Sequence, residues 1–223
     1  MHSGAHSDVH PLHSPKAVLF DLLTGLLDSW SLWDAVAGNA ADGRRWRSLY
    51  LVRTYGEGAY RPYEALVQEA AVAAGLPAAM AERLAGRYGE LAPWPEVGEV
   101  LGPLQGRVPM AVVTNCSERL GRIAAACTGI AFDVVVTAER AAFYKPQPQP
   151  YELALAELGA AAGECLFAAG SAYDLLGAAR VGLPVFWHDR IGMARPQGAP
   201  PPLARHPTLH PLHALVGGGR GRP

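Results

Sequence analysis

The chain has few cysteines and no long apolar run. Its 223 residues include three cysteines, Cys116, Cys127 and Cys165, whose spacing is not that of a metal site. So small and odd a number does not suggest a disulfide framework, and we expect reduced thiols. Charged residues or glycine interrupt each apolar stretch before the ~18 residues that a membrane-spanning helix needs. Residues 1–15 contain no apolar signal-peptide segment. These absences predict a cytoplasmic protein with no membrane partner.

A charge excess of one sign is also missing. The formal net charge is −1, from 19 basic and 20 acidic residues. The basic residues are scattered, apart from a small cluster at 43–47. Because nucleic-acid binding needs an extended basic surface, we expect no nucleic-acid partner. Half of the residues are apolar, which is enough for one principal domain with room for a smaller insertion.

The two ends differ in composition from the rest of the chain. Four histidines, His2, His6, His10 and His13, lie in a polar leader, and residues 217–223 consist of glycine, arginine and proline. The leader could bind a stray metal ion, but its composition favours a solvated segment. We therefore predict a disordered leader at residues 1–15 and a disordered tail at residues 217–223.

Between these ends, short apolar runs alternate with segments of helical periodicity. Such alternation is typical of parallel strands joined by right-handed helical crossovers. It predicts an α/β fold with a doubly wound, Rossmann-like parallel sheet. The predicted strands are residues 17–20, 110–113, 134–136, 166–168 and 185–187.

One interval interrupts this alternation. From Asp28 to about Pro93 no strand is evident, and the pattern is helical, as at residues 65–74 and 78–88. Four or five helices inserted after the first strand would form a cap. We therefore predict a helical cap domain at residues 29–93, inserted into an α/β core of residues 16–28 and 94–216. The site should lie between them.

Polar residues follow two of the predicted strands. Asp21 ends the first, at the edge where open α/β sheets build their sites, and Leu23 two positions later cannot donate a proton. Thr114 and Asn115 end the second, before a helix near Glu118, and their side chains with backbone donors favour an anion site. Taken singly, an aspartate here can be a turn residue, and the second segment can be a capping box.

Two more segments add a lysine and a second aspartate. Lys145 is held in a loop by three prolines before a helix that begins at Tyr151. A lysine on a stiff loop can balance the charge of Asp21, although an ordinary surface lysine is the alternative. Asp174 follows a small-residue turn, where it could also serve the helix dipole. Four strand ends that each carry such a group indicate a hydrolase with an aspartate nucleophile.

From about residue 16 to 190, these segments resemble the haloacid dehalogenase superfamily, and are most similar to the L-2-haloacid dehalogenases. The family motif Asp-x-Tyr-Gly-Thr-Leu is matched at Asp21 and Leu26, with Thr24 and Gly25 in inverted order. Further matches are Trp46-Arg47, Thr114-Asn115, Lys145-Pro146 with Tyr151, Tyr173-Asp174 and Trp187-His188-Asp189-Arg190.

The resemblance implies a hydrolytic dehalogenase of small 2-haloacids. Asp21 would displace the halide and form an ester that water hydrolyses, so the partner is a small halogenated carboxylate. The implied catalytic residues are Asp21, Lys145 and Asp174, and the implied halide-binding residues are Arg47 and Asn115. The implied substrate-binding residues are Leu22, Thr114, Tyr151, Ser171 and Tyr173.

Two positions separate the chain from phosphatase members of the superfamily. Leu23 and Ala169 stand where those relatives carry acidic residues, which leaves a poor cage for Mg²⁺, so we expect no metal and no cofactor. Ser171 replaces the asparagine of the dehalogenases. A phosphatase, a hydrolase of another small carboxylate and a catalytically quiet binding relative remain alternatives. A homodimer through the cap helices is compatible with the sequence.

Overall fold

The computed structural model describes residues 14–217; most of the predicted leader and tail, residues 1–13 and 218–223, lies outside the described residues. Two residues that the sequence assigned to these ends belong to the folded part. Pro15 is buried, and Gly217 is the last residue of a helix. Within residues 14–217, no helix combines the length and the apolar character required to cross a bilayer.

Six parallel strands form one sheet, and the predicted doubly wound α/β fold is confirmed. The strand order is β3-β2-β1-β4-β5-β6, with β1 at the centre. The sixth strand was not predicted, because its three residues at the sheet edge, Ala204, Arg205 and His206, carry no apolar run. The strands are β1 (Ala17–Asp21), β2 (Met110–Thr114), β3 (Val134–Thr137), β4 (Cys165–Ala169), β5 (Val185–His188) and β6 (Ala204–His206).

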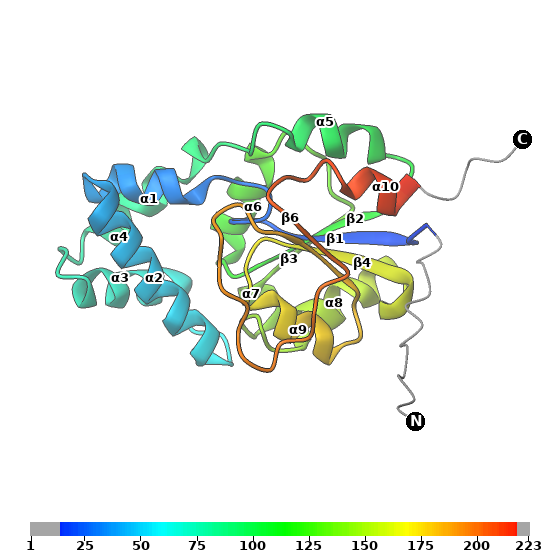
Figure 1. Cartoon of the computed structure of the whole chain (residues 1–223). Coiled ribbons are helices and arrows are strands. Elements are labelled where there is room, and N and C mark those ends of the chain that lie inside the picture. Colours follow the sequence, from blue (N-terminus) through cyan, green and yellow to red (C-terminus); the bar gives the residue numbers. More distant parts are fainter. Residues whose placement is uncertain (1–13, 218–223) are drawn as a thin grey trace, which may run out of the picture.

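Helices cover both faces of the sheet (Figure 1). Val18 and Phe20 of β1 pack in one core cluster with α5 (Val97–Leu101), α6 (Glu118–Cys127) and α10 (Leu212–Gly217). Ala17 and Leu19 pack in a second cluster with α8 (Gln149–Leu158) and α9 (Asp174–Arg180). A strand buried on both faces must be apolar throughout, which explains the continuous run that made β1 visible in the sequence. Short elements α7 (Ala138–Ala141), η2 (Gly102–Leu104) and η3 (Ala162–Glu164) complete the core.

The interval between β1 and β2 contains helices and no strand among its described residues. We call its helical elements before α5 the cap helices; in Figure 1 they form a blue and cyan group beside the strand ends. Asp28 and Asn39 cap the first two of them by accepting hydrogen bonds from Ser31 N and Asp42 N. That this group is a separate domain stays a prediction. The cap helices are α1 (Ser29–Ala37), α2 (Ala40–Glu57), α3 (Tyr63–Ala73), α4 (Met80–Gly86) and η1 (Tyr88–Glu90).

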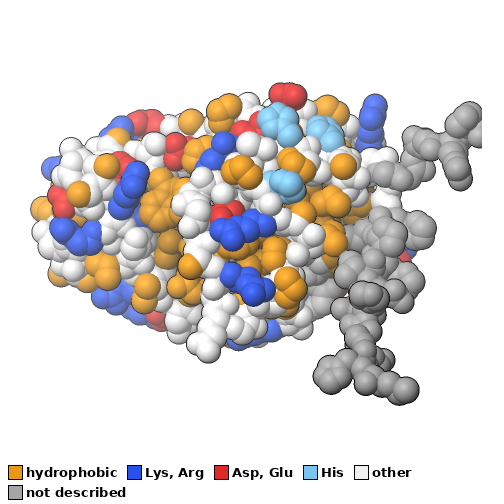
Figure 2. All heavy atoms as spheres, in the orientation of Figure 1, with side chains coloured by type: hydrophobic (Ala, Val, Ile, Leu, Met, Phe, Trp, Pro, Cys, Tyr) orange, Lys and Arg blue, Asp and Glu red, His pale blue; other side chains and the backbone are white. Residues whose placement is uncertain are grey.

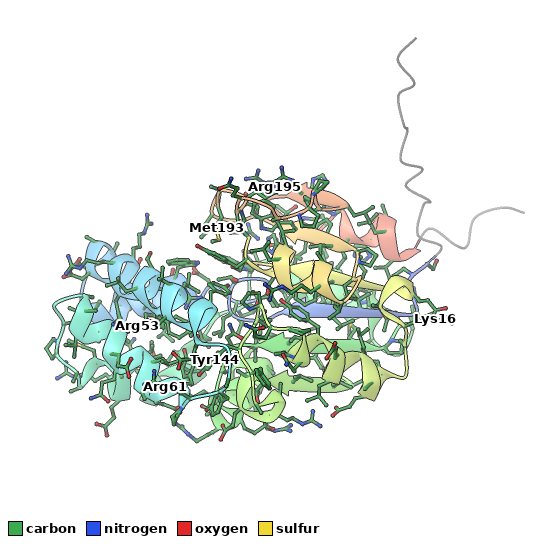
Figure 3. The ribbon with its side chains drawn as sticks, turned by 90° about the horizontal axis from the view of Figure 1, so that it is seen from below. Lys16, Arg53, Arg61, Tyr144, Met193 and Arg195 are labelled. Carbon is green, nitrogen blue, oxygen red and sulfur yellow. The ribbon has the colours of Figure 1, made fainter. Side chains whose placement is uncertain are left out.

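The loop that contains Tyr144 contacts the cap helices. Tyr144 OH donates to the Arg61 carbonyl at 2.8 Å, and the Tyr144 ring stacks on Tyr60 with centroids 5.5 Å apart. Figure 3 shows Tyr144 and Arg61 side by side at this junction, far from Lys16 at the opposite end of the sheet. Because Tyr144 precedes Lys145, the same contacts fix the loop that carries the lysine.

On the surface, basic and acidic side chains are interspersed, as Figure 2 shows for one face.

Candidate active site

The end of β1, the loop that carries Lys145 and the start of α9 bring three charged side chains together. Lys145 Nζ lies 2.7 Å from Asp21 Oδ1 and 3.0 Å from Asp174 Oδ1. All three side chains are buried. Tyr151 OH donates a hydrogen bond to Asp174 Oδ1 at 2.8 Å. The residues that the sequence singled out as catalytic therefore form one contact group, although up to 153 positions separate them in the chain (from Asp21 to Asp174).

The second oxygen of Asp21 accepts three hydrogen bonds. Its donors are Thr24 Oγ1 at 2.5 Å, Thr24 N at 3.2 Å and Gly25 N at 3.0 Å. The inverted Thr24-Gly25 order thus still supplies a hydroxyl group to the nucleophile. Gly25 has no room for a side chain, since a Cβ would lie 2.2 Å from the Asp21 carbonyl oxygen. Gly170 is equally confined, because its Cβ would lie 2.1 Å from Gly25 N, so the loops after β1 and β4 touch backbone to backbone.

Asn115 holds the backbone of the lysine loop. Lys145 N donates to Asn115 Oδ1 at 2.7 Å, and Asn115 Nδ2 donates to the Lys145 carbonyl at 3.1 Å. Tyr50 of α2 in turn donates to the Asn115 carbonyl at 2.9 Å. The sequence assigned Asn115 to halide binding, and one of its two amide N–H bonds remains for that purpose. Its positioning of Lys145 was not predicted.

The two carboxylates that share Lys145 differ in the direction of their pKa shifts. Burial would raise the pKa of Asp21, but the Lys145 ammonium and hydrogen bonds from Lys145 and Thr24 outweigh it and lower that pKa. For Asp174, burial dominates, and the charge of Asp21 adds to it, so the pKa rises to about 6 despite Lys145. Burial would lower the pKa of Lys145, yet its two carboxylate partners raise it. At neutral pH the site thus holds an ionised Asp21, an ammonium, and an Asp174 able to exchange a proton.

Ser171 and Tyr173 contact a residue that the sequence did not indicate. Tyr55 of α2 donates to Ser171 Oγ at 2.6 Å and stacks on Tyr173 with ring centroids 4.2 Å apart. Tyr173 N also donates to Ser171 Oγ, at 3.3 Å. Ser171 therefore accepts two hydrogen bonds and keeps its own hydroxyl hydrogen for another partner. Nothing in a helical sequence pattern distinguishes Tyr55 from other tyrosines of the cap helices.

Arg47 lies buried in the cap helices with unused hydrogen-bonding capacity. Its side chain is 1% exposed, and its guanidinium carbon lies 4.7 Å from the ring centroid of Trp30 and 5.3 Å from that of Trp33. Among the described residues, Arg47 Nε and Nη1 and the indole Nε1 atoms of both tryptophans have no acceptor. A buried cation with unpaired donors is costly, so this cluster is suited to an anionic ligand.

Leu22 and Thr114 complete the predicted set. Leu22 is buried after β1, and its carbonyl accepts from Leu26 N and Leu27 N at 3.0 Å each. Thr114 ends β2, and its hydroxyl donates to Cys116 Sγ at 3.7 Å. The Thr114 hydroxyl is thus engaged with a neighbour, whereas its predicted role in substrate binding stays a prediction.

The donor set does not fit the Mg²⁺ of phosphatase relatives. Mg²⁺ requires six oxygen ligands in an octahedron, usually with carboxylates among them. Here the Lys145 ammonium lies between Asp21 and Asp174, and the positions that could add carboxylates hold Leu23 and Ala169. The positive charge beside the nucleophile is therefore supplied by a side chain.

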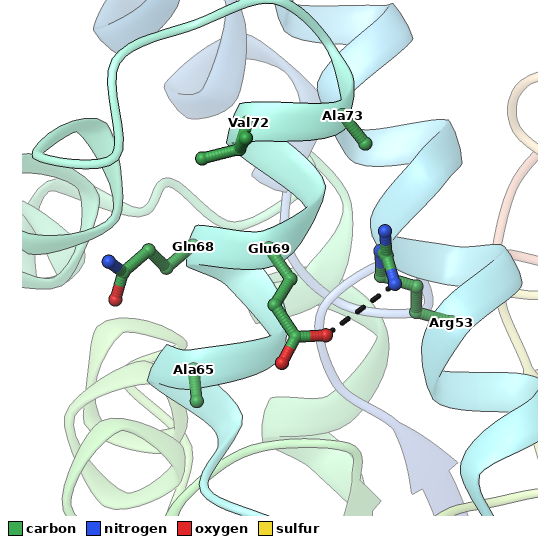
Figure 4. Close-up of a pocket in the computed structure, with 6 residues that line it drawn as sticks. All are labelled: Arg53, Ala65, Gln68, Glu69, Val72 and Ala73. Atoms are coloured by element: carbon green, nitrogen blue, oxygen red, sulfur yellow. Dashed lines mark hydrogen bonds and ion pairs between the residues drawn. The ribbon is translucent and has the colours of Figure 1, made fainter.

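A surface hollow of about 550 Å³ lies elsewhere, between α2 and α3 (Figure 4). Arg53 and Glu69 form an ion pair across it at 3.5 Å. None of the charged residues around Asp21 lines it. This hollow is therefore separate from the candidate site.

Comparison with known proteins agrees with this geometry. Haloacetate dehalogenase H-2 of Moraxella sp. is 32% identical over 117 residues, 51% of this chain and 52% of that protein. (S)-2-haloacid dehalogenase H-109 of Pseudomonas putida is 27% identical over 194 residues, 79% of this chain and 87% of that protein. The chain thus spans about half the length of the first relative and most of the second.

The fold is shared with a solved structure of L-2-haloacid dehalogenase from Xanthobacter autotrophicus that has chloropropionic acid covalently bound. Its TM-score is 0.81 at 24% identity, and the match covers 92% of this chain and 99% of that one. The model of the haloacid dehalogenase-like hydrolases matches residues 15–182, three quarters of the chain. By this match, the chain belongs to the haloacid dehalogenase-like hydrolase family.

Proposed function

We propose that the chain is a hydrolytic dehalogenase of small 2-haloacids, with Asp21 as the nucleophile. The observation that carries this proposal is the Asp21–Lys145–Asp174 group, in which a side-chain cation keeps one carboxylate ionised. Leu23 and Ala169 supply neither a general acid nor a metal ligand, which disfavours phosphoryl transfer. A carbon–halogen bond needs no proton on its leaving group.

In the first step, Asp21 Oδ1 attacks the carbon that bears the halogen. Oδ2 already accepts three hydrogen bonds, whereas Oδ1 accepts one, from Lys145, and so keeps a lone pair for the attack. The new carbon–oxygen bond forms as the carbon–halogen bond breaks, and the electron pair leaves with the halide. The carbon is inverted, and Asp21 becomes an ester.

Arg47 and the remaining N–H of Asn115 would bind the departing halide, where preorganised donors stabilise developing charge most. The hydroxyl hydrogen of Ser171 and backbone amides beside Leu22, with Thr114, would hold the substrate carboxylate. Tyr173 would wall the pocket, since a less hydrated carboxylate is the stronger nucleophile. Tyr151 would act on the substrate indirectly, through its hydrogen bond to Asp174.

In the second step, water attacks the Asp21 carbonyl carbon and transfers a proton to Asp174. Oδ2, now the ester carbonyl oxygen, gains negative charge among its three donors from Thr24 and Gly25. Collapse breaks the bond between the carbonyl carbon and Oδ1, and the product alkoxide takes the proton back from Asp174. A 2-hydroxy acid leaves with an enzyme oxygen, and Asp21, which keeps the hydroxyl group of the water, releases the remaining proton to solvent and is again a carboxylate. Esterification removes the charge of Asp21, one cause of the raised pKa of Asp174, so Asp174 can act as a base.

The relatives support this substrate class. The Moraxella protein is named a haloacetate dehalogenase and the Pseudomonas putida protein an (S)-2-haloacid dehalogenase. The Xanthobacter structure holds chloropropionic acid covalently bound, as an ester intermediate would be.

Halide release from 2-chloropropionate and haloacetates, with and without a chelator, tests the proposal. We expect release that the chelator does not affect, and a loss of at least about 10⁴-fold in Asp21→Asn. A single turnover in oxygen-18 water should label Asp21 before the product. Label that enters the product directly, or phosphate-ester hydrolysis that requires Mg²⁺, would contradict the mechanism.

A further inference from the structure

His188, at the end of β5, contacts the Thr24–Gly25 loop that follows Asp21. His188 Nδ1 lies 2.8 Å from the Gly25 carbonyl oxygen, and the side chain is fully buried. A carbonyl oxygen only accepts hydrogen bonds, so Nδ1 must carry the hydrogen. The sequence analysis placed this histidine directly after the predicted strand 185–187, in the Trp187-His188-Asp189-Arg190 match, and gave it no role.

A second side chain holds the same loop. Trp94 Nε1 donates to the Thr24 carbonyl at 3.1 Å. Because Thr24 C=O and Gly25 N–H belong to one peptide group, Trp94 holds one end of that group while its other end donates to Asp21 Oδ2. His188 fixes the carbonyl of the next peptide group. The direction of the Gly25 N–H therefore depends on two donors outside the loop.

The surroundings keep His188 in one state. Among residues 14–217, its Nε2 makes no hydrogen bond that meets the geometric criteria, and it lies 3.6 Å from Glu96 Oε1, which already accepts from Arg190 Nη2 and from Leu209 N at 3.2 Å. Glu96 and Arg190 are the charged groups that face the ring. Burial, together with Arg190, lowers the pKa of His188, although the backbone of Gly25, the charge of Glu96 and the backbone of Pro207 oppose this. The neutral ring with hydrogen on Nδ1 is thus favoured.

We propose that His188 is a positioning residue that, together with Trp94, aims the backbone N–H of Gly25 at Asp21 Oδ2. It touches neither substrate nor reacting atoms and acts through the Thr24–Gly25 loop. Its consequence for turnover rests on the proposed function, because Oδ2 then gains charge during ester hydrolysis. Its consequence for the ionisation of Asp21 does not, since the same N–H stabilises the free carboxylate.

Two substitutions separate positioning from simple space filling. His188→Asn keeps an N–H donor at the location of Nδ1, whereas His188→Gln moves the amide towards Nε2 and removes the bond to Gly25. Asp189→Asn is the matched control, because Asp189 is the next residue, also buried, and pairs with Arg205 and Met193 N away from Asp21. Trp94→Phe removes the second donor from a side chain that is only partly buried.

The first measurement is the titration of Asp21 in the free protein, by ¹³C NMR of labelled aspartate assigned with Asp21→Asn. We expect a raised pKa of Asp21 in His188→Gln and, more weakly, in Trp94→Phe, with no change in His188→Asn or Asp189→Asn. The second measurement is turnover of 2-chloropropionate, which should fall roughly 10- to 100-fold in His188→Gln and stay within about 3-fold in His188→Asn.

Different results would contradict the proposed function and the inference about His188. A wild-type protein without haloacid turnover would refute the proposed function, while the titration would still decide the role of His188. Equal titration and equal turnover in His188→Gln and His188→Asn would overturn the inference. If His188→Gln does not fold, an unchanged Asp21 titration in Trp94→Phe overturns it as well.

Discussion

The two sides of the candidate site differ in how their hydrogen bonds are satisfied. On the core side, at the strand ends, the Asp21 carboxylate has four donors, and Asn115 clamps the lysine loop at two atoms. On the cap side, Arg47 and the indoles of Trp30 and Trp33 have unpaired N–H groups among the described residues. The core side is therefore preorganised before any ligand binds, whereas the cap side has donors that remain available to a ligand.

One core-side atom departs from this pattern. Asp174 Oδ1 accepts from Lys145 and Tyr151, but Oδ2 has no hydrogen-bond partner in the described part of the chain. A buried carboxylate oxygen with no donor is costly unless a ligand or water pairs with it. We assign this oxygen to the water that hydrolyses the ester. The comparison thus separates an atom that binds water from donors that bind an anion.

Asp174→Asn tests the core side and should have the largest effect of the three substitutions that follow. The amide oxygen can keep both donors of Oδ1, and the amide nitrogen takes the place of unpaired Oδ2, but the base is lost. We expect one halide released per enzyme molecule and then turnover that is roughly 10²- to 10⁴-fold slower. Mass spectrometry should find the ester on Asp21. Loss of the initial halide release would contradict this assignment.

The same variant has a predicted effect on stability. The pKa of Asp174 is about 6 in the folded protein against an ordinary 3.8, so protonation stabilises the folded state. As the pH rises from about 4 to about 6, the wild-type free energy of unfolding should therefore fall, by at most about 3 kcal/mol. Asp174→Asn should lack this fall and be the more stable protein above pH 6. Denaturant titrations at pH 4 and pH 7 measure the difference.

The sequence predicted the core side of the site better than it predicted the individual contacts. Five of the six strands and the carboxylate at the end of β1 were predictable because β1 and its neighbours are buried on both faces, which forces apolar runs that end at Asp21 and Thr114. A contact of Lys145 with Asp21 was suggested by its stiff, proline-rich loop, which follows α7 and not a strand end. Residue types alone did not indicate which atoms pair.

Four contacts show why the rest was not predictable. The hydroxyl of Thr24 reaches Asp21 because of the loop conformation, and the Cβ limits at Gly25 and Gly170 appear only once two loops are packed together. His188 meets Gly25 across 163 positions of sequence. Tyr55 lies on a helix whose pattern gives no sign that its hydroxyl crosses to Ser171. Such pairings depend on tertiary packing, which local periodicity does not encode.

Arg47→Met tests the cap side and should separate activity from stability. Removing the unpaired guanidinium should lower kcat/KM roughly 10²- to 10³-fold. The free energy of unfolding should rise by about 1–2 kcal/mol, because the apolar side chain replaces a buried cation whose Nε and Nη1 have no hydrogen-bond partner in the described part of the chain. Arg53→Met on the same helix is the control: its ion pair is partly exposed, so stability should change by less than about 0.5 kcal/mol. A large loss of stability in Arg47→Met would mean that its donors are paired.

Trp30→Phe should have the smallest effect, because it keeps an aromatic ring under the Arg47 guanidinium and removes only the indole N–H. If that N–H faces the leaving halide, bromide should raise the melting temperature less than in the wild type, corresponding to an affinity about 3- to 10-fold weaker. Trp33→Phe gives the matched measurement for the fully buried indole. If Trp30→Leu weakens halide binding and Trp30→Phe does not, the ring orients Arg47, and the anion is bound by the guanidinium alone.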